Sequence, residues 1–551
     1  MNVAQTLYLC CVSISINFGV REVPAGCHLD LVELTVFARE GRFEEAGLKL
    51  SMENMSHALN FTSTDSCQLF VGVAVGIISV LLCAIFLSRG KRPRNSPPNA
   101  HIGMPLVGNY IGFACNPVKF VNDCMMKFGK IYTVPMLHKN MTFLLGPEVS
   151  APFFKLTDDY MSQSEVYGFM TPVFGKNVVY DADPKKRIQQ MQKMATGLTS
   201  HRLRAYIPKI EKETIDYLSK WGDSGSVNIS DALSELTILT ASRCLHGDDV
   251  RETMFADVAR IYHDLDKGVT PLSFFFPYAP IPAHAMRDKA RQEMVQLFSK
   301  VIRSRREKQN GNDTSDNTDI LQVFMDLKYK DGSALTEDEI VGLLIALLFA
   351  GQHTSSITST WTCMFLIHNK RCLDEVMKEQ NKVLNGELKA PLDFDSVGNM
   401  EYLQNAIKES LRLHPPLILL MRMAMKDIET TLEGKTFIIP KGDIVVTSPA
   451  VSGRIETVFS NPNEFQPERF GAERYEQKTP YAYLGFGAGL HACMGQQFGL
   501  LQVKTILSII FRNFEITPVD NNFPEPDYTA MVVGPKNHCM VNYKKKKISF
   551  I

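Results

Sequence analysis

One cysteine near the end of the chain stands in a loop suited to a metal-bound thiolate. Cys493 follows His491 by two residues, lies between Gly489 and Gly495, and precedes an apolar run from Phe498 to Phe511 that predicts a helix. The start of a helix favours a charged sulfur, because the positive end of the dipole and unpaired backbone N–H groups face it. The glycines can adopt positive φ and let backbone amides approach the sulfur. The loop therefore predicts a thiolate ligand to a haem iron.

Three other interpretations of the cysteines have to be weighed. Most cysteines of an intracellular enzyme are small buried hydrophobes, and no two here form a C-x-x-C pair that would indicate zinc. The glycines also resemble a dinucleotide loop, but Leu490 stands where the third glycine belongs and a βαβ setting is lacking. We predict that the other eleven cysteines are small buried hydrophobes: Cys10, Cys11, Cys27, Cys67, Cys83, Cys115, Cys124, Cys244, Cys363, Cys372 and Cys539.

A second group of reactive residues lies within a long apolar segment. Thr336 and Glu339 have the spacing of a capping box, and a proline-free run continues from Glu337 to about Asn369. This predicts a helix of about 32 residues, or about 48 Å, enough to cross a whole domain. Gly351 near its middle costs about 1 kcal/mol of helix stability. A gap over a flat cofactor would explain that cost.

His353 and Thr354 follow this glycine and could deliver protons. Oxygen activation needs protons at the distal oxygen without release of peroxide, and a hydroxyl beside an ionisable group serves such a relay. The alternative is a satisfied core histidine, with the Thr354 hydroxyl bonded to the carbonyl four residues back. Because the cysteine loop lies downstream, we favour the relay and assign both residues as catalytic.

Composition limits the classes of function. The chain has 551 residues, 45% of them hydrophobic, and 59 basic residues balance 59 acidic ones. A net charge of zero gives no basic bias toward nucleic acid. The length would allow several domains, but no linker-like stretch interrupts residues 101–551, so we expect one catalytic domain there. The polar stretch 309–318 is expected to be a surface loop between helices.

The N-terminal part predicts a membrane anchor. Residues 67–88 are apolar over about the 20 residues that a spanning helix needs, and a buried core helix is the alternative. The basic residues that follow place the catalytic domain in the cytosol. Residues 89–100 read as a basic, proline-rich hinge, and residues 1–66 as an extension that is lumenal or a mistaken start.

Four motifs, in this order, resemble the cytochrome P-450 superfamily: Ala350–Thr354, Glu409–Arg412, Phe465–Phe470 and the cysteine loop. Other segments look most like the sterol 14α-demethylases, namely Glu165–Gly175, Arg412–Arg422 and Tyr528–Gly534. The resemblance covers about residues 101–547. It implies a mainly α fold with a small β-rich lobe, around residues 130–146 and 435–448, behind one N-terminal transmembrane helix.

The resemblance also implies the chemistry. The cofactor would be haem b with Cys493 as the axial iron ligand, O2 the co-substrate, and the partners a membrane and an NADPH-cytochrome reductase. A sterol 14α-methyl group would be oxidised to an alcohol, then an aldehyde, and released as formate, at the endoplasmic reticulum membrane. Rival readings are a cytochrome P-450 hydroxylating another lipid, a non-catalytic sterol- or haem-binding membrane protein, and an oxygen-independent peroxide-rearranging member.

Further residues receive roles from the same resemblance. A buried charge network beneath the haem is implied for Glu409, Arg412 and Arg469. Arg422 stands in an apolar stretch, a poor place for an unpaired charge, which makes a propionate partner plausible from the sequence itself. Leu490 and Ala492 replace basic residues usual in the family, which puts charge-driven reductase docking in question. The residues implied to bind the propionates are Tyr167, Tyr180, Arg187, Arg422 and His491.

A rigid apolar substrate needs an apolar, aromatic-lined cavity. Any one Met or Phe is as often ordinary core as pocket. In the family that the chain resembles, plant-like and some protozoal members carry Phe at the position of Phe169, whereas animal and fungal members carry a smaller aliphatic residue. The resemblance therefore implies that this ring crowds a second methyl at sterol C4 and favours 4α-monomethyl sterols such as obtusifoliol. The residues implied to line the pocket are Tyr167, Phe169, Met170, Phe174, Phe349, Ala350, Leu417, Met421, Met531 and Val532.

Overall fold

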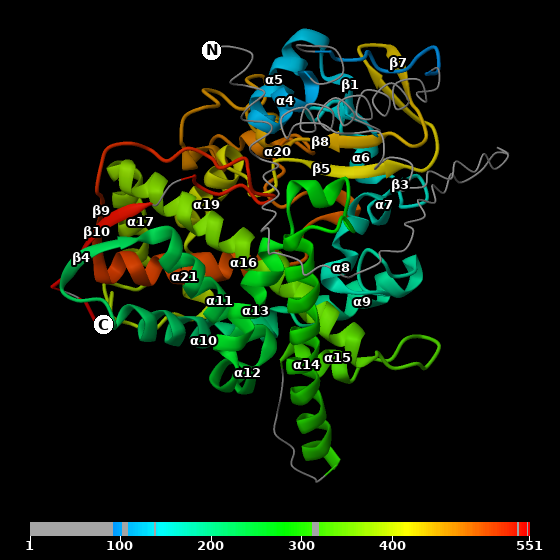
Figure 1. The fold of residues 1–551 in the computed structure, drawn as a ribbon. Helices are drawn as coiled ribbons and strands as arrows, with labels where there is room; N and C mark the ends of the chain where they lie inside the picture. Colours follow the sequence, from blue (N-terminus) through cyan, green and yellow to red (C-terminus); the bar gives the residue numbers. More distant parts are fainter. Residues whose placement is uncertain (1–91, 102–107, 137–138, 311–318, 537–538, 548) are drawn as a thin grey trace, which may run out of the picture. The chain divides into compact units, whose positions relative to one another are not determined.

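The computed structural model describes residues 92–101, 108–136, 139–310, 319–536, 539–547 and 549–551. The predicted anchor, the extension before it and most of the predicted loop 309–318 lie outside the described residues. Helices make up most of the rest, with the sheets gathered mainly at one end of this unit (Figure 1). This is the mainly α fold with a small β-rich lobe that the sequence predicts.

The α-helices are α4 Gly108–Cys115, α5 Pro117–Phe128, α6 Ala151–Lys155, α7 Ser164–Tyr167, α8 Thr171–Phe174, α9 Pro184–Thr196, α10 Ser200–Leu218, α11 Ile229–Ala241, α12 Asp248–Thr253, α13 Phe255–Lys267, α14 Pro282–Asn310, α15 Ile320–Met325, α16 Glu337–His368, α17 Lys370–Val383, α18 Phe394–Gly398, α19 Glu401–Leu413, α20 Pro449–Ser452 and α21 Gln496–Asn513. Short 3-10 or π turns are η1 Gly168–Met170, η2 Ser242–His246, η3 Pro271–Phe274, η4 Pro467–Phe470, η5 Glu476–Lys478 and η6 Gly489–His491.

Three sheets contain the strands. The largest has the order β1-β2-β8-β5-β3, the second β4-β10-β9, and β6 pairs with β7 alone. The strands are β1 Ile131–Met136, β2 Lys139–Leu144, β3 Met161–Ser162, β4 Ser224–Asn228, β5 Leu420–Ala424, β6 Ile428–Leu432, β7 Lys435–Ile439, β8 Ile444–Thr447, β9 Phe514–Pro518 and β10 Met540–Lys545. The predicted lobe matches β1, β2, β7 and β8, whereas β3 and β5 had no clear signal.

Chain-distant segments are joined within the largest sheet. Strand β2 runs parallel to β8, with Met141 opposite Ile444. The described part of the predicted hinge lies along this lobe: the Ala100 amide donates to the Thr133 carbonyl at 2.7 Å. Arg92 forms an ion pair with Asp443 at 2.7 Å. Residues 92–100 are therefore bonded to the sheet.

The long helix α16 is the centre of the domain (Figure 1). It begins with the predicted capping box, in which the Glu339 amide donates to Thr336 Oγ1 and the Thr336 amide donates to Glu339 Oε2. It packs against α11, α14, α19 and α21. Among the described residues it is the one helix long and apolar enough to span a membrane, and its burial against these neighbours identifies it as a core helix.

Candidate active site

The loop that carries Cys493 is held close to a neighbouring helix. The Cys493 amide donates to the Phe486 carbonyl at 2.9 Å, and helix α21 begins three residues after the cysteine. Gly489 has φ +66°, and a Cβ there would lie 2.1 Å from the Phe154 carbonyl oxygen of α6. Only glycine satisfies both the left-handed backbone and this close approach. The loop conformation thus fixes where the sulfur points.

Cys493 is an exposed residue whose sulfur is nevertheless surrounded by many atoms. The residue is exposed, yet burial is the main influence on the sulfur and raises the pKa of the thiol, while the backbone N–H of Gly495 acts in the opposite direction. The helix start alone therefore does not produce a thiolate at neutral pH. A bound metal cation would do so, because a coordinated thiol is deprotonated.

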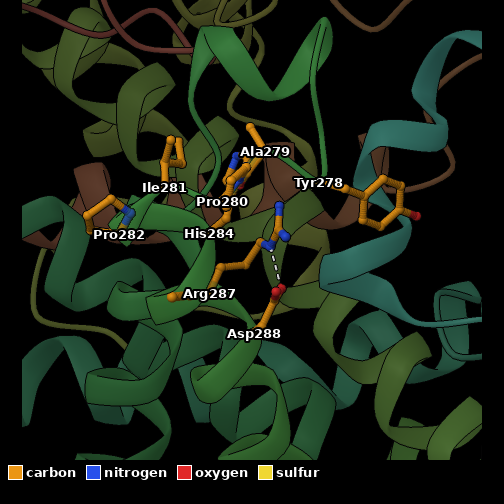
Figure 2. A pocket seen from close by; sticks show the side chains of 9 residues that line it. Tyr278, Ala279, Pro280, Ile281, Pro282, His284, Arg287 and Asp288 are labelled. Atoms are coloured by element: carbon orange, nitrogen blue, oxygen red, sulfur yellow. Dashed lines mark hydrogen bonds and ion pairs between the residues drawn. The ribbon is translucent and has the colours of Figure 1, made fainter. Parts of the chain in front are cut away.

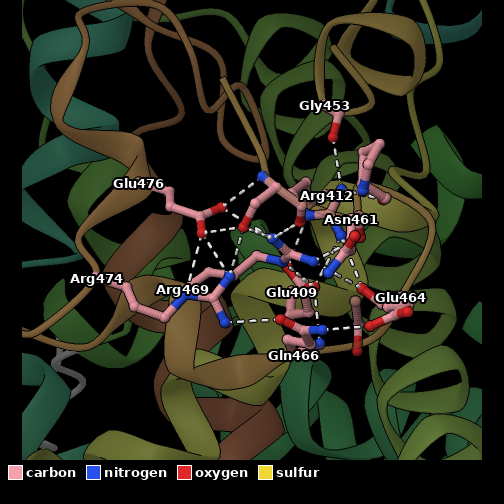
Figure 3. Close-up of polar contacts among 12 residues, drawn as sticks. Glu409, Arg412, Gly453, Asn461, Glu464, Gln466, Arg469, Arg474 and Glu476 are labelled. Carbon is pink, nitrogen blue, oxygen red and sulfur yellow. Dashed lines mark hydrogen bonds and ion pairs between the residues drawn. The ribbon is translucent and has the colours of Figure 1, made fainter. Parts of the chain in front are cut away.

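Glu409 anchors a buried charge network on the segment leading to this loop (Figure 3). Its two carboxylate oxygens accept from Arg412 Nε at 2.7 Å and from Arg469 Nε at 3.0 Å. All three side chains have no exposed surface. The structure thus brings together α19 and η4, which are sixty residues apart in the chain.

The remaining donors of both arginines are also satisfied. Arg412 Nη1 donates to the carbonyls of Gly453 and Pro462, both at 2.6 Å. Arg469 Nη1 forms a second ion pair, with Glu476 at 2.9 Å. Sequence reasoning missed Glu476, because nothing in its local pattern links it to the motif. Full pairing is the condition under which buried charges are tolerated.

A cluster of basic side chains lies beside the cysteine loop. Asp158 binds two of them: His491 Nε2 lies 2.9 Å from its carboxylate, and Arg187 forms an ion pair with it. Arg422 on β5 is 2% exposed, donates from Nη1 to the Phe153 carbonyl at 2.6 Å, and has an Nε without a hydrogen-bond partner among the described residues. Sequence reasoning missed Asp158.

This cluster fits a cofactor that carries carboxylates. Burial, together with the charges of Arg422 and Arg187, lowers the pKa of His491 to about 4. Arg187 is paired with Asp158, but Arg422 has no carboxylate partner among the described residues, so the site has an excess of positive charge and an unsatisfied Nε. Two haem propionates would balance that charge and accept from that donor, so the residues present fit the group.

The aromatic residues predicted for the pocket form a contiguous wall. Tyr167 stacks on Tyr180 with centroids 5.2 Å apart, and its Oη accepts from the Met421 amide at 3.3 Å. Phe174 contacts Tyr180 at 6.2 Å and Phe349 at 5.9 Å. This wall joins α7, α8 and α16 and lies beside the middle of the long helix.

Phe169 extends the wall toward a segment that sequence reasoning missed. Its ring lies 6.2 Å from Tyr167 and 5.7 Å from Phe274 of η3. Not every predicted pocket residue is equally enclosed: Leu417 is 46% exposed. Ala350 is also exposed, and Met170, Met421, Met531 and Val532 are half-buried.

The middle of α16 has an open side. A Cβ built on Gly351 would meet no atom within 4 Å, as the predicted gap requires. Thr354 Oγ1 donates to the Ala350 carbonyl at 2.6 Å, which is the local bond weighed as the alternative to the relay. His353 Nε2 lies 3.0 Å from Asp266 Oδ1 of α13, but the two atoms do not form a hydrogen bond.

A surface pocket of about 430 Å³ shares no lining residue with this site (Figure 2). Its buried polar side chains are paired: His284 Nε2 lies 2.9 Å from Ser273 Oγ, and Arg287 Nε donates to Asp288 at 2.8 Å. Tyr278 at its edge is 72% exposed. Because His284 and Arg287 are paired in this way, we assign no reaction to this pocket.

Comparisons with known proteins agree with this geometry. The family model described as Cytochrome P450 matches residues 97–542. The solved structure of a retinoic acid bound cyanobacterial CYP120A1 has a TM-score of 0.72 at 22% identity, over 83% of this chain and 100% of that one, which shows the fold. The chain belongs to the cytochrome P-450 family: it is a haem-thiolate monooxygenase that uses O2 and electrons from a reductase.

Within that family it belongs with the sterol 14α-demethylases. The obtusifoliol 14-alpha demethylase of Triticum aestivum is 46% identical over 82% of this chain and 99% of its own length. The lanosterol 14-alpha demethylase of Homo sapiens is 38% identical over 82% of this chain and 87% of its own length. Both alignments cover most of the catalytic domain.

Proposed function

We propose that the chain removes the 14α-methyl group of a sterol precursor in three O2- and NADPH-dependent steps, with formate as the one-carbon product. The supporting observation is the aromatic wall from Tyr167 to Phe349 beside the middle of α16, the same stretch of the helix in which Gly351 leaves an open position. A flat, rigid, apolar molecule is the substrate class that such a wall accommodates. The names of the relatives supply the reaction.

Residues of the chain would hold the cofactor. Cys493 would ligate the iron, while Arg187, Arg422 and His491, with Tyr167 and Tyr180 beside them, would bind the propionates. When bound, the haem supplies an iron centre whose thiolate ligand favours cleavage of the O–O bond. The Glu409 network would help to fix the position of the cysteine loop, because Arg412 also binds the carbonyls of Gly453 and Pro462 in the segment before that loop.

Proton delivery would be the task of α16 and α13. Asp266 is 36% exposed and reaches solvent, whereas His353 is 24% exposed and lies one residue from Thr354. Protons would pass from the carboxylate to the imidazole and on to the Thr354 hydroxyl, which both accepts and donates. Its bond to Ala350 would orient that hydroxyl rather than remove it from the route.

The preferred sterol would carry one methyl group at C4. Phe169 is 7% exposed, and Tyr167 and Phe274 contact its ring on two sides, so it has little freedom to turn away. A fixed ring would crowd the second C4 methyl. The relative named for obtusifoliol is more similar to this chain than the one named for lanosterol, 46% against 38%.

The site of action would be the endoplasmic reticulum membrane, with the catalytic domain in the cytosol and the anchor at residues 67–88. Exposed apolar side chains on two neighbouring elements support contact with lipid: Tyr110 and Ile111 on α4 are 39% and 41% exposed, and Phe276 after η3 is 50% exposed. The Tyr110 ring contacts Phe275 at 6.3 Å, which joins the two elements. The electron donor would be an NADPH-cytochrome reductase.

Turnover tests this function. The full chain, with NADPH-cytochrome reductase in vesicles, is given obtusifoliol and lanosterol separately, and the 14-demethylated sterols and formate are measured. We expect both products, with a higher kcat/KM for obtusifoliol. Hydroxylation elsewhere without formate would show a cytochrome P-450 of another lipid, and sterol binding without any product would show a binding protein.

A further inference from the structure

Tyr262 of α13 is a buried tyrosine that the proposed function does not use. It is 3% exposed, and its ring lies 4.9 Å from that of Phe349 and 5.7 Å from that of His353, both on α16. Val258, Ile261 and Leu265 bury the same face of α13. The ring therefore packs as core between α13 and the reactive part of the long helix.

The hydroxyl of Tyr262 has no hydrogen-bond partner among the residues that the structure describes. An unsatisfied buried hydroxyl is destabilising, and Phe would fill the same volume without that cost. Burial and the nearby charge of Asp266 both raise the pKa of Tyr262 far above its ordinary value, so the hydroxyl stays protonated. Packing thus explains why an aromatic ring occupies position 262, but it does not explain why that ring carries a hydroxyl.

A second unsatisfied atom belongs to the neighbouring His353 ring. His353 Nε2 is buried without a hydrogen bond, although Asp266 Oδ1 is only 3.0 Å away. Asp266 follows Tyr262 by four residues on the same helix, so both side chains leave α13 on one face. Tyr262, His353 and Asp266 thus bring three polar groups to one contact between α13 and α16. Two of these groups, Tyr262 Oη and His353 Nε2, have no hydrogen-bond partner among the described residues.

We propose that Tyr262 is a positioning residue of the proton route: through one bridging water, its hydroxyl completes the hydrogen bonding of the His353–Asp266 pair. A water needs two to four polar partners, and this cluster supplies three. The tyrosine transfers no proton. It holds the imidazole and the carboxylate in line, so that a proton leaving Asp266 reaches His353.

The proposal rests on the relay assigned under the proposed function, and Tyr262→Phe tests it by removing one oxygen. We expect a three- to tenfold loss of sterol product per NADPH, the kinetic equivalent of about one net hydrogen bond, with more peroxide and a changed solvent isotope effect. Haem content, the carbon monoxide spectrum and sterol affinity should stay as in the unmodified protein. A merely structural role would lower haem content and affinity instead.

Tyr132→Phe is the matched control. That tyrosine is also fully buried, in β1, and its hydroxyl donates to the Val121 carbonyl at 2.8 Å. Its loss should reduce thermal stability but leave product per NADPH unchanged. Equal coupling ratios in the Tyr262 variant, the control and the unmodified protein would overturn the proposal.

A second readout does not depend on turnover. In the full-length holoprotein, 3-fluorotyrosine at position 262 gives a 19F signal that reports the hydrogen bonding of its hydroxyl. Asp266→Asn and His353→Ala should each shift that signal, and Asp123→Asn on α5 should not. A signal unmoved by either change at the site would refute the proposal even if the sterol reaction itself were not found.

Discussion

The Glu409 network on the cysteine side and the contact of α16 with α13 on the other side differ in how completely their polar groups are paired. On the cysteine side, Glu409, Arg412 and Arg469 have no exposed surface, and each charge has a partner. On the side formed by α16 and α13, His353 Nε2 and Tyr262 Oη are buried without hydrogen bonds among the described residues. Saturated networks hold a geometry, whereas unsaturated ones are available for exchange of protons and ligands. The domain thus separates a fixed support from an adaptable reactive face.

Among the changes that test this difference between the two sides, removal of the Cys493 sulfur should have the largest effect. In Cys493→Ala we expect complete loss of the red-shifted Soret band that thiolate-ligated haem gives with carbon monoxide after reduction, because the other cysteines do not lie in this loop. The prediction that Cys115 is a buried hydrophobe was wrong, because its thiol is exposed, and Cys115→Ala should keep the band. Retention of the band in the Cys493 variant would assign the ligand elsewhere.

Breaking the buried network should come next. Glu409→Gln leaves two fully buried arginines short of charge, and the free energy of unfolding should fall by about 3–5 kcal/mol. Chemical denaturation followed by helical circular dichroism and haem absorbance measures it. Glu375→Gln, which breaks an exposed pair with Lys378 at 2.7 Å, should change stability by less than about 1 kcal/mol. Similar losses in both variants would remove the distinction between the two sides.

Two glycines give a sharper form of the same comparison. Gly489→Ala puts a Cβ against the Phe154 carbonyl at a position with left-handed backbone. The free energy of unfolding should fall by about 2 kcal/mol or more. Gly351→Ala meets no neighbouring atom, so the melting temperature should not fall, while sterol affinity, read from the sterol-induced Soret shift, should weaken. A destabilised Gly351 variant with normal sterol affinity would contradict an open reactive face.

The smallest effect is expected at the surface of the cysteine loop. Leu490 is 61% exposed, at a position where the resemblance to the wider family implies a basic residue. Leu490→Arg should lower the KM for reductase by a few fold at low salt, and the gain should vanish near 1 M salt, where the Debye length is about 3 Å. Met126→Arg on α5, 78% exposed, serves as the control. A gain that persists at high salt would argue against docking by charge.

Local signals carried most of what the sequence predicted. The Thr336–Glu339 capping box lies within one helical turn, so its spacing alone reveals it, whereas the role of the Glu409–Arg412 pair came from the order of the motifs that resemble the family. Asp158, Asp266 and Glu476 were missed because their partners are distant in the chain and acidic residues are common on surfaces. Strand β5 was missed for another reason: it reads as an apolar run without alternation, which does not distinguish a buried strand from a helix.

The ion pair of Arg92 with Asp443 has a consequence for synthesis of the chain. Its two residues are separated by 351 positions. At about 5–20 residues per second, Asp443 leaves the ribosome about 20–70 s after Arg92. For most of that time the β1–β2 hairpin exists without its parallel neighbour β8, and the edge of β2 is open to wrong partners. Rapid folding of the helix α16 cannot shorten the delay before β8 is synthesised. The β lobe is therefore the part of a nascent chain that would most need a chaperone.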